Sequence, residues 1–196
     1  MARSRFDAAI AAIDAANADD PSTIEVRGQV RPKELAHAEL MAEWLDRLDP
    51  AADEAQRIAA RAHHLRRWSL PRSSYPDGRA GYLRWRTVLK KQHADEVGEI
   101  LAGVGYDATT IERVQHIIRK EGLGSDPQVQ THEDALCLVF LETQLAATVD
   151  DLGDERMLDV IQKTAKKMSP AGLAHVATIP MRDEDRALIA RALSEA

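Results

Sequence analysis

THEDALCLVFLE, at residues 131–142, is a strongly apolar stretch that we expect to form the central helix of the fold. Around it the chain is rich in two residues that favour helices, with 32 alanines and 19 leucines among 196 residues. β-Branched residues are few and show no sustained alternation, which argues against sheets. The sequence therefore predicts an all-α protein.

Prolines, glycines and capping residues divide the chain into expected helices. A first loop is expected at 18–32, and a longer loop, 69–81, carries two prolines and two glycines. Thr109 and Thr131 are the expected N-caps of two helices. The expected helices are 5–17, 32–48, 51–67, 82–103, 109–121, 131–148, 154–167, a short one opened by Ser169 and Pro170, and a last one from Asp183. We predict one helical domain over 1–196, with 149–196 as an added helical layer.

Composition excludes several classes of protein. With 44% apolar and 30% charged residues, the chain is neither disordered nor fibrous. The single cysteine, Cys137, cannot form an internal disulfide, so we expect a reducing compartment and a cytoplasmic protein. No run of 18 apolar residues occurs, and Asp7 and Asp14 make the first helix amphipathic, so we expect neither a membrane span nor a signal peptide.

Positive charge and aromatic rings gather in one segment, residues 61–91. This segment carries a net charge of +8 within a chain of net charge −6, and it holds four of the eight aromatic residues. Arginines suit phosphates and rings suit a base or sugar, so we expect an anionic, phosphorylated ligand here. Alternatively, the arginines pair with the acidic remainder and the rings brace a long loop. The residues expected to contact this ligand are Arg67, Trp68, Arg72, Tyr75, Arg79, Tyr82, Trp85 and Arg86.

Histidines lie on the apolar faces of two expected helices. His37 shares a stripe with Met41, and His93 shares one with Val97, so both imidazoles should point inward. A lone inward histidine is more often a hydrogen-bonded core residue, but the adjacent pair at 63 and 64 adds two more imidazoles. Neutral imidazole is the commonest protein ligand of transition metals. His37, His63 and His64 are therefore candidate metal ligands.

Asp134 is the candidate carboxylate that would complete such a site, because it opens the apolar central helix. An equally good reading makes Asp134 part of a capping pattern with Thr131. The remaining histidines, His116, His132 and His175, are expected at the surface or at helix caps.

The order of these residues resembles that in the HD superfamily of metal-dependent phosphohydrolases. The resembling segments are ELAHAEL with His37, ARAHHL with the histidine pair, KKQHADEVG with His93 and THEDALCLVFL with Asp134. The resemblance covers residues 33–148. It implies an HD-like helical core, a bound metal and phosphohydrolase activity.

One position departs from the HD pattern, because His64 stands where the superfamily has an aspartate. Three histidines and one aspartate would bind Mg²⁺ poorly and favour Zn²⁺, Fe²⁺, Mn²⁺, Co²⁺ or Ni²⁺. If the register slips by one, Leu65 takes the aspartate position and the metal site is incomplete.

A second resemblance covers nearly the whole chain. The segments IDAAN, RAHHLRRW, PRSSYP, GRAGYLRWR, EDALCLVFLE and KTAKKMSP resemble the family known as domain of unknown function 4202. This resemblance implies a shared fold and brings no activity with it.

These features predict a metal-dependent phosphohydrolase acting on a nucleotide or another small phosphate ester. The arginine-rich segment 66–86 would hold the phosphate, and His93, if it is not a metal ligand, would act as the general acid. A first alternative is a phosphate- or nucleotide-binding protein with a degenerate metal site and no catalysis. A second is contact with RNA or tRNA, against which the net negative charge argues. The oligomeric state is left open.

Overall fold

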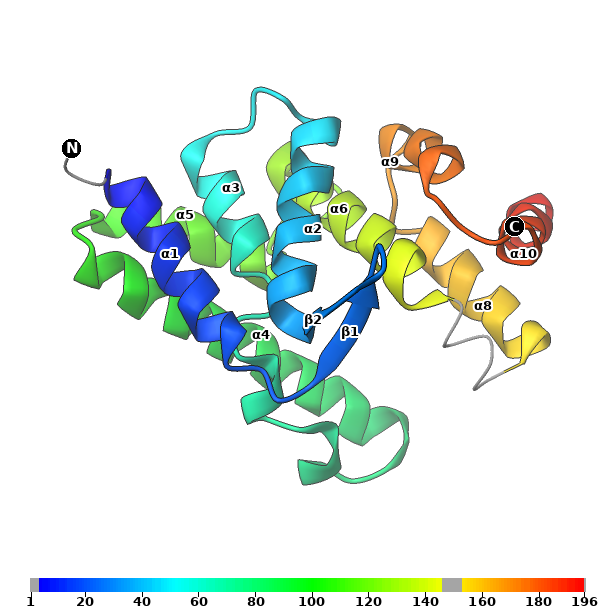
Figure 1. Cartoon of the computed structure of the whole chain (residues 1–196), viewed down its shortest axis with the longest axis horizontal. Coiled ribbons are helices and arrows are strands. Elements are labelled where there is room, and N and C mark those ends of the chain that lie inside the picture. Colours follow the sequence, from blue (N-terminus) through cyan, green and yellow to red (C-terminus); the bar gives the residue numbers. More distant parts are fainter. Residues whose placement is uncertain (1–3, 146–152, 196) are drawn as a thin grey trace.

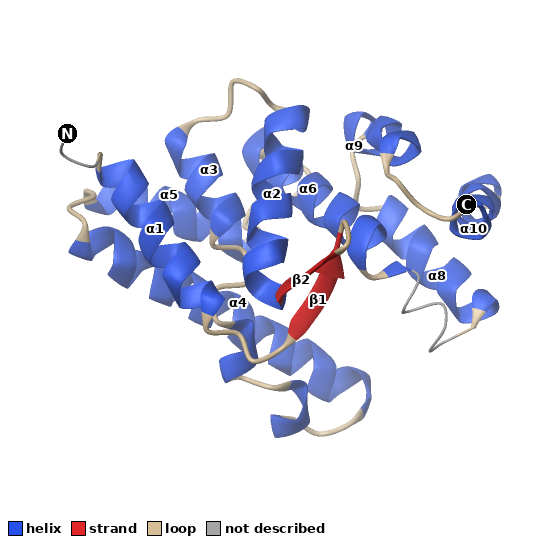
Figure 2. Ribbon diagram, in the orientation of Figure 1, coloured by secondary structure: helices blue, strands red, loops and turns tan. Residues whose placement is uncertain are grey.

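The computed structural model describes residues 4–145 and 153–195, and within them the fold is all-α, as predicted. Figure 2 shows helices throughout, with one short hairpin in the described part of the chain. The elements are α1 Arg5–Ala18, β1 Thr23–Val26, β2 Gln29–Pro32, α2 Lys33–Leu48, α3 Glu54–Arg61, η1 Arg67–Ser69, η2 Arg72–Ser74, α4 Gly78–Gly103, α5 Ala108–Arg119, α6 Pro127–Thr143, α8 Asp154–Ala165, α9 Pro170–His175, η3 Val176–Thr178 and α10 Asp183–Ser194.

The apolar stretch at 131–142 lies within α6, which packs against α2, α3, α5 and α9. Side chains of α6 enter two apolar clusters. Leu138 packs with Trp44 of α2 and with α8 and α10, whereas Val129 packs with Ile58 of α3 and with α4 and α5. In Figure 1, α6 accordingly lies between α1–α5 on one side and α8–α10 on the other. The predicted boundary between 148 and 149 falls outside the described residues, so the division into a core and an added layer stays a prediction.

A β-hairpin occupies part of the expected loop 18–32. Its strands pair antiparallel, and Val26 pairs with Gln29 across a turn formed by Arg27 and Gly28. Both turn residues have positive φ, 53° and 77°, as a tight two-residue hairpin turn requires. The four-residue strands are too short to give the alternation on which a prediction from sequence depends.

The third helix is shorter than predicted, and this places the histidine pair on a turn. Asp53 and Gln56 form a capping box, so α3 begins at Glu54. The helix ends at Arg61, and Arg66 then adopts the left-handed conformation with φ 49°. Residues 62–66 therefore form a turn, and adjacent side chains there point in directions that a helical wheel does not give.

Two of the predicted N-caps are wrong, because in each case an aspartate closer to the N-terminus caps the helix. Asp107, not Thr109, caps α5 by accepting from the Thr110 N–H at 2.9 Å. Asp126, not Thr131, caps α6, and Pro127 takes the first helical position.

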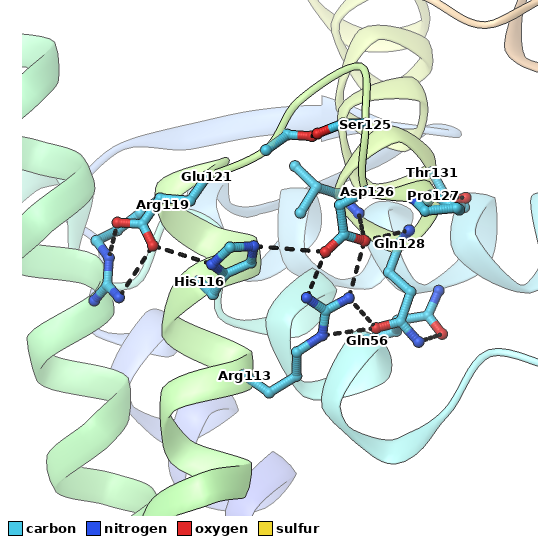
Figure 3. A network of polar contacts seen from close by, with 12 residues as sticks. Gln56, Arg113, His116, Arg119, Glu121, Ser125, Asp126, Pro127, Gln128 and Thr131 are labelled. Carbon is cyan, nitrogen blue, oxygen red and sulfur yellow. Dashed lines mark hydrogen bonds and ion pairs between the residues drawn. The ribbon is translucent and has the colours of Figure 1, made fainter.

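Asp126 also joins α5 to α6, as Figure 3 shows. Its two carboxylate oxygens accept hydrogen bonds from Arg113 at 2.5 and 2.9 Å, while Gln128 bonds to the same guanidinium and to Gln56 of α3. The hydroxyl of Thr131, by contrast, only donates to the carbonyl of Pro127 within its own helix.

The stability of two variants should separate these two caps. Asp126→Ala removes the cap and the Arg113 pair, and we expect it to lower the free energy of unfolding by about 1–2 kcal/mol. Thr131→Ala should lower it by less than about 0.5 kcal/mol. Urea unfolding measures both, and a larger loss for Thr131→Ala would contradict the structure.

Among the described residues, no helix combines the length and the apolar character needed to cross a membrane.

Candidate functional site

Glu34, His37 and His64 converge on one point. Glu34 and His37 lie one turn apart at the start of α2, and His64 comes from the turn after α3. One Glu34 oxygen, Oε2, lies 3.3 Å from His37 Nδ1 and 3.1 Å from His64 Nδ1. A ligand atom from each of the three side chains lies within 4.8 Å of the other two, so the group has the dimensions of a metal site.

Asp20, in the segment that precedes the β-hairpin, holds Glu34 in place. Asp20 accepts the backbone N–H of Glu34 at 3.0 Å with one oxygen and the N–H of Ser22 at 2.9 Å with the other. Both bonds hold the first turn of α2 against the segment that precedes the hairpin. The carboxylate of Glu34 is thereby aimed inward, where its side chain is only 4% exposed.

The charges of this group suit a cation. Burial alone would raise the pKa of Glu34, but the attraction of His64 when that imidazole is protonated, together with hydrogen bonds from both imidazoles, outweighs it and holds that pKa well below its usual range. Burial lowers the pKa of His64 to about 3, although Glu34 acts in the opposite direction. At neutral pH Glu34 is thus ionised and His64 neutral, which are the forms that bind a metal.

Arg67 connects this group to the basic segment. Its Nη1 donates to His64 Nε2 at 3.2 Å, and its Nε lies 4.0 Å from the second oxygen of Glu34. The guanidinium also stacks on the ring of Trp85, 4.8 Å from its centre. The first arginine after the turn therefore contacts both the candidate metal group and an aromatic residue of α4.

His63 points the other way and pairs with His132 of α6. Nδ1 of His63 lies 2.7 Å from Nε2 of His132, so one imidazole donates and the other accepts. His132 is 2% exposed, which corrects the expectation that it lies at the surface or at a cap. Burial lowers the pKa of His63 well below its usual value and that of His132 to about 3. Behind this pair, Lys120 and Glu133 form a buried ion pair.

Asp134 does not join the candidate metal group. Its oxygens accept from the backbone N–H of Ser169 at 2.8 Å, from the Ser169 hydroxyl at 2.5 Å and from Gln130 at 3.0 Å. Ser169 is itself the N-cap of α9, so Asp134 fastens α9 to α6. Glu34 supplies the carboxylate that the sequence assigned to Asp134. The one signal in the sequence that could have revealed Glu34 is its spacing of three residues from His37 on one helix.

His93 has one ring nitrogen bonded and one without a partner. Its Nδ1 lies 2.8 Å from the carbonyl oxygen of Leu65, to which it must donate. Its Nε2 is buried and has no hydrogen-bond partner among the described residues. Burial lowers the pKa of His93 to about 4, so Nε2 carries a free lone pair at neutral pH. The ring centre lies 6.0 Å from that of His64.

Two cavities adjoin the candidate metal group and share Arg67. The aromatic cavity has a volume of about 180 Å³ and is lined by Glu34, Arg67, Trp68, Arg72 and Trp85, among others. The cation cavity is smaller, about 20 Å³, and is lined by His64, Arg67, Arg86, Lys90, His93 and Lys120, among others. Glu34 thus faces the aromatic cavity and Arg67 faces both, while His64 faces the cation cavity and also a smaller cavity that His37 lines.

The predicted ligand-binding residues divide between the cavities and the loop. Arg72 lines the aromatic cavity but also donates to the carbonyls of Tyr75 and Pro76, each at 2.8 Å. Trp85 likewise donates from Nε1 to the carbonyl of Leu70 at 2.9 Å. Both side chains therefore brace the loop, which the alternative interpretation expected of the ring of Trp85 but not of Arg72, for which it expected an acidic partner. The residues of the predicted set that line neither cavity are Tyr75, Arg79 and Tyr82.

A comparison with protein families supports the resemblance seen over nearly the whole chain. A family model described as "Domain of unknown function (DUF4202)" matches residues 7–189. No curated protein and no solved structure matches the chain. The more distant resemblance to HD phosphohydrolases stays a prediction.

The protonation of His93 can be measured by long-range ¹H–¹⁵N NMR of its ring nitrogens. We expect hydrogen on Nδ1 and none on Nε2 at pH 7, with a midpoint near pH 4 in place of the ordinary 6.5. Because unfolding frees this imidazole to bind a proton, the free energy of unfolding should fall as the pH drops from 6.5 through 4. Hydrogen on Nε2, or a midpoint near 6.5, would contradict the geometry around Leu65.

Proposed function

Because the chain belongs to this DUF4202 family, whose description assigns no activity, we propose a function from its own side chains: a metal-dependent phosphohydrolase acting on a nucleotide or similar small phosphate ester. The observation that carries the proposal is the convergence of Glu34, His37 and His64 within 4.8 Å, beside a cavity whose charged lining is entirely cationic.

Glu34, His37 and His64 would hold the metal. Two imidazoles and one carboxylate form a donor set of the kind found in catalytic zinc sites, which leave a coordination position open. The same nitrogen and oxygen donors suit Fe²⁺, Mn²⁺, Co²⁺ and Ni²⁺. A metal bound there would supply an acidified water as nucleophile and a Lewis acid for a phosphoryl oxygen.

The protein would position the substrate through the two cavities. Arg67 borders both, so its guanidinium can bond phosphate oxygens at the mouth of the cation cavity while Trp85 holds it by stacking. Trp68 faces the aromatic cavity, where a ring or sugar of the substrate would lie against it. The phosphate would then lie beside His64 and hence beside the metal group.

His93 would accept a proton. A general acid, the role predicted from the sequence, needs hydrogen on Nε2, whereas the bond to Leu65 places the hydrogen on Nδ1. His93 lines the cation cavity, and its Nε2 lone pair, which has no partner among the described residues, suits a water molecule that gives up its proton there. The proposal therefore assigns His93 the role of base.

One observation favours the alternative of phosphate binding without catalysis. The hydrogen bonds from His37 and His64 to Glu34, together with that from Arg67 to His64, already satisfy much of the group within the protein. A protein that only binds a phosphorylated ligand needs nothing more from these residues. Contact with RNA stays a prediction that no observation here tests.

The test is metal content and turnover of the purified protein, with a phosphatase and phosphodiesterase panel and added Zn²⁺, Fe²⁺, Mn²⁺, Co²⁺ or Ni²⁺. We expect one bound metal per chain and turnover that chelators abolish. Glu34→Gln should weaken metal binding and lower turnover by at least about 100-fold, since even partners that only orient metal ligands are worth 10–100-fold.

The matched control is Glu43→Gln on the same helix, an exposed carboxylate that pairs only with Arg27. It should bind metal and turn over substrate as the unaltered protein does. Absence of both metal binding and turnover in the unaltered protein would refute the hydrolase. Stabilisation by nucleotides that chelators do not affect, without product, would establish the binding alternative instead.

A further inference from the structure

The cation cavity contains positive charge that nothing in the described protein neutralises. Two of its four cations have nearby carboxylates, because Lys120 pairs with Glu133, and Arg67 lies 4.0 Å from Glu34. Arg86 and Lys90 have no carboxylate partner among the described residues. Arg86 bonds only to the hydroxyl of Tyr82, at 3.2 Å.

The uncompensated charge of Arg86 also lowers the pKa values of the two paired cations of the cavity. Burial is the main cause that lowers the pKa of both Arg67 and Lys120, and repulsion from Arg86 lowers each further. Like charges gathered around one cavity are unfavourable unless a ligand of opposite charge enters it. Two uncompensated positive charges match an anion of charge −2.

The sizes of the cavities limit the shape of this anion. The cation cavity has a volume of about 20 Å³, which holds about one water molecule, and its lining includes the apolar side chains Leu89 and Ile118. A phosphate group can therefore lie only at the mouth of this cavity, and no organic group fits inside it. The aromatic cavity, on the other side of Arg67, has about 180 Å³ and thus room for one organic substituent.

The buried lone pair of His93 gives a second, independent indication of a ligand. His93 lines the cation cavity, and its Nε2 is buried, has no partner among the described residues and cannot donate, so it needs a hydrogen from whatever enters. A fully ionised phosphate has none to give, but a water molecule beside the phosphate has. The cavity itself therefore suits one water molecule, with the anion beside it at the cavity mouth.

From this arrangement we propose that the substrate is a phosphomonoester, whose terminal phosphate lies at the mouth of the cation cavity and whose single organic group lies in the aromatic cavity. The proposal rests on the proposed function and specifies its substrate class. In the reaction, a water oxygen bonds to phosphorus as the bond from phosphorus to the ester oxygen breaks. One water proton passes to the leaving oxygen, by way of His93, and the other stays on the phosphate, so the products are an alcohol and hydrogen phosphate.

The test compares 4-nitrophenyl phosphate with bis(4-nitrophenyl) phosphate, using the intact protein and each of the metals named above. We expect kcat/KM for the monoester to exceed that for the diester by at least about 100-fold, because the diester has one negative charge fewer and a second bulky group. Equal or faster hydrolysis of the diester would overturn the monoester proposal and leave the hydrolase standing. Hydrolysis of neither ester would refute the hydrolase and, with it, this inference.

Adjacent lysines on α4 provide a matched pair of variants. Lys90 lines the cation cavity, whereas Lys91 is 73% exposed and pairs with Asp95. Lys90→Gln should raise KM for the monoester and the inhibition constant of inorganic phosphate, each by about 10-fold, the value of one charge-assisted hydrogen bond. Lys91→Gln should change neither, and equal effects of the two variants would show that net charge alone, not the cavity, attracts phosphate.

Discussion

The buried carboxylate of Glu34 is the interaction on which the whole site depends. It accepts from His37 on its own helix and from His64 on the turn after α3, and Arg67 lies beside it. An ionised group at this depth is costly unless it is fully paired, so its partners must come to it. Removing it would leave two imidazoles without their shared acceptor and Arg67 without the carboxylate it lies beside. Glu34 thus joins the start of α2 to the turn that follows α3.

Backbone geometry brings those partners within reach. The capping box at Asp53 and the end of α3 at Arg61 leave a turn, and the left-handed residue Arg66 closes it. Because of this turn, His63 faces α6 and His64 faces α2. Had α3 continued to 67, as the sequence predicts, neighbouring histidines would differ by only about 100° in direction. The turn also places Arg67 next to the histidine it contacts.

The sequence predicted the all-α fold, the central position of α6 and the inward direction of His37 and His93, because all of these follow from helical periodicity. The sequence did not predict the features that depend on turns and on contacts between residues far apart in the chain. Asp134 looked like a ligand because it begins an apolar helix, but Ser169, 35 residues later, takes both its oxygens. Glu34 looked like an ordinary first-turn acid, since its burial depends on the preceding hairpin segment, which no periodic pattern reveals.

The expectation that aromatic rings brace the long loop holds for Trp85, whereas phosphate binding by the basic segment stays a proposal. Arg72 and Trp85 brace the loop, whereas Arg86 and Lys90 remain uncompensated at a cavity beside the metal group. The central claim is that Glu34, His37 and His64 bind one metal ion together. The most direct test is an anomalous-difference map from crystals soaked in Co²⁺. The account predicts a single strong peak about 2.0–2.2 Å from a ligand atom of each of these three side chains. A peak at other residues, with these three still bonded only to one another, would contradict it.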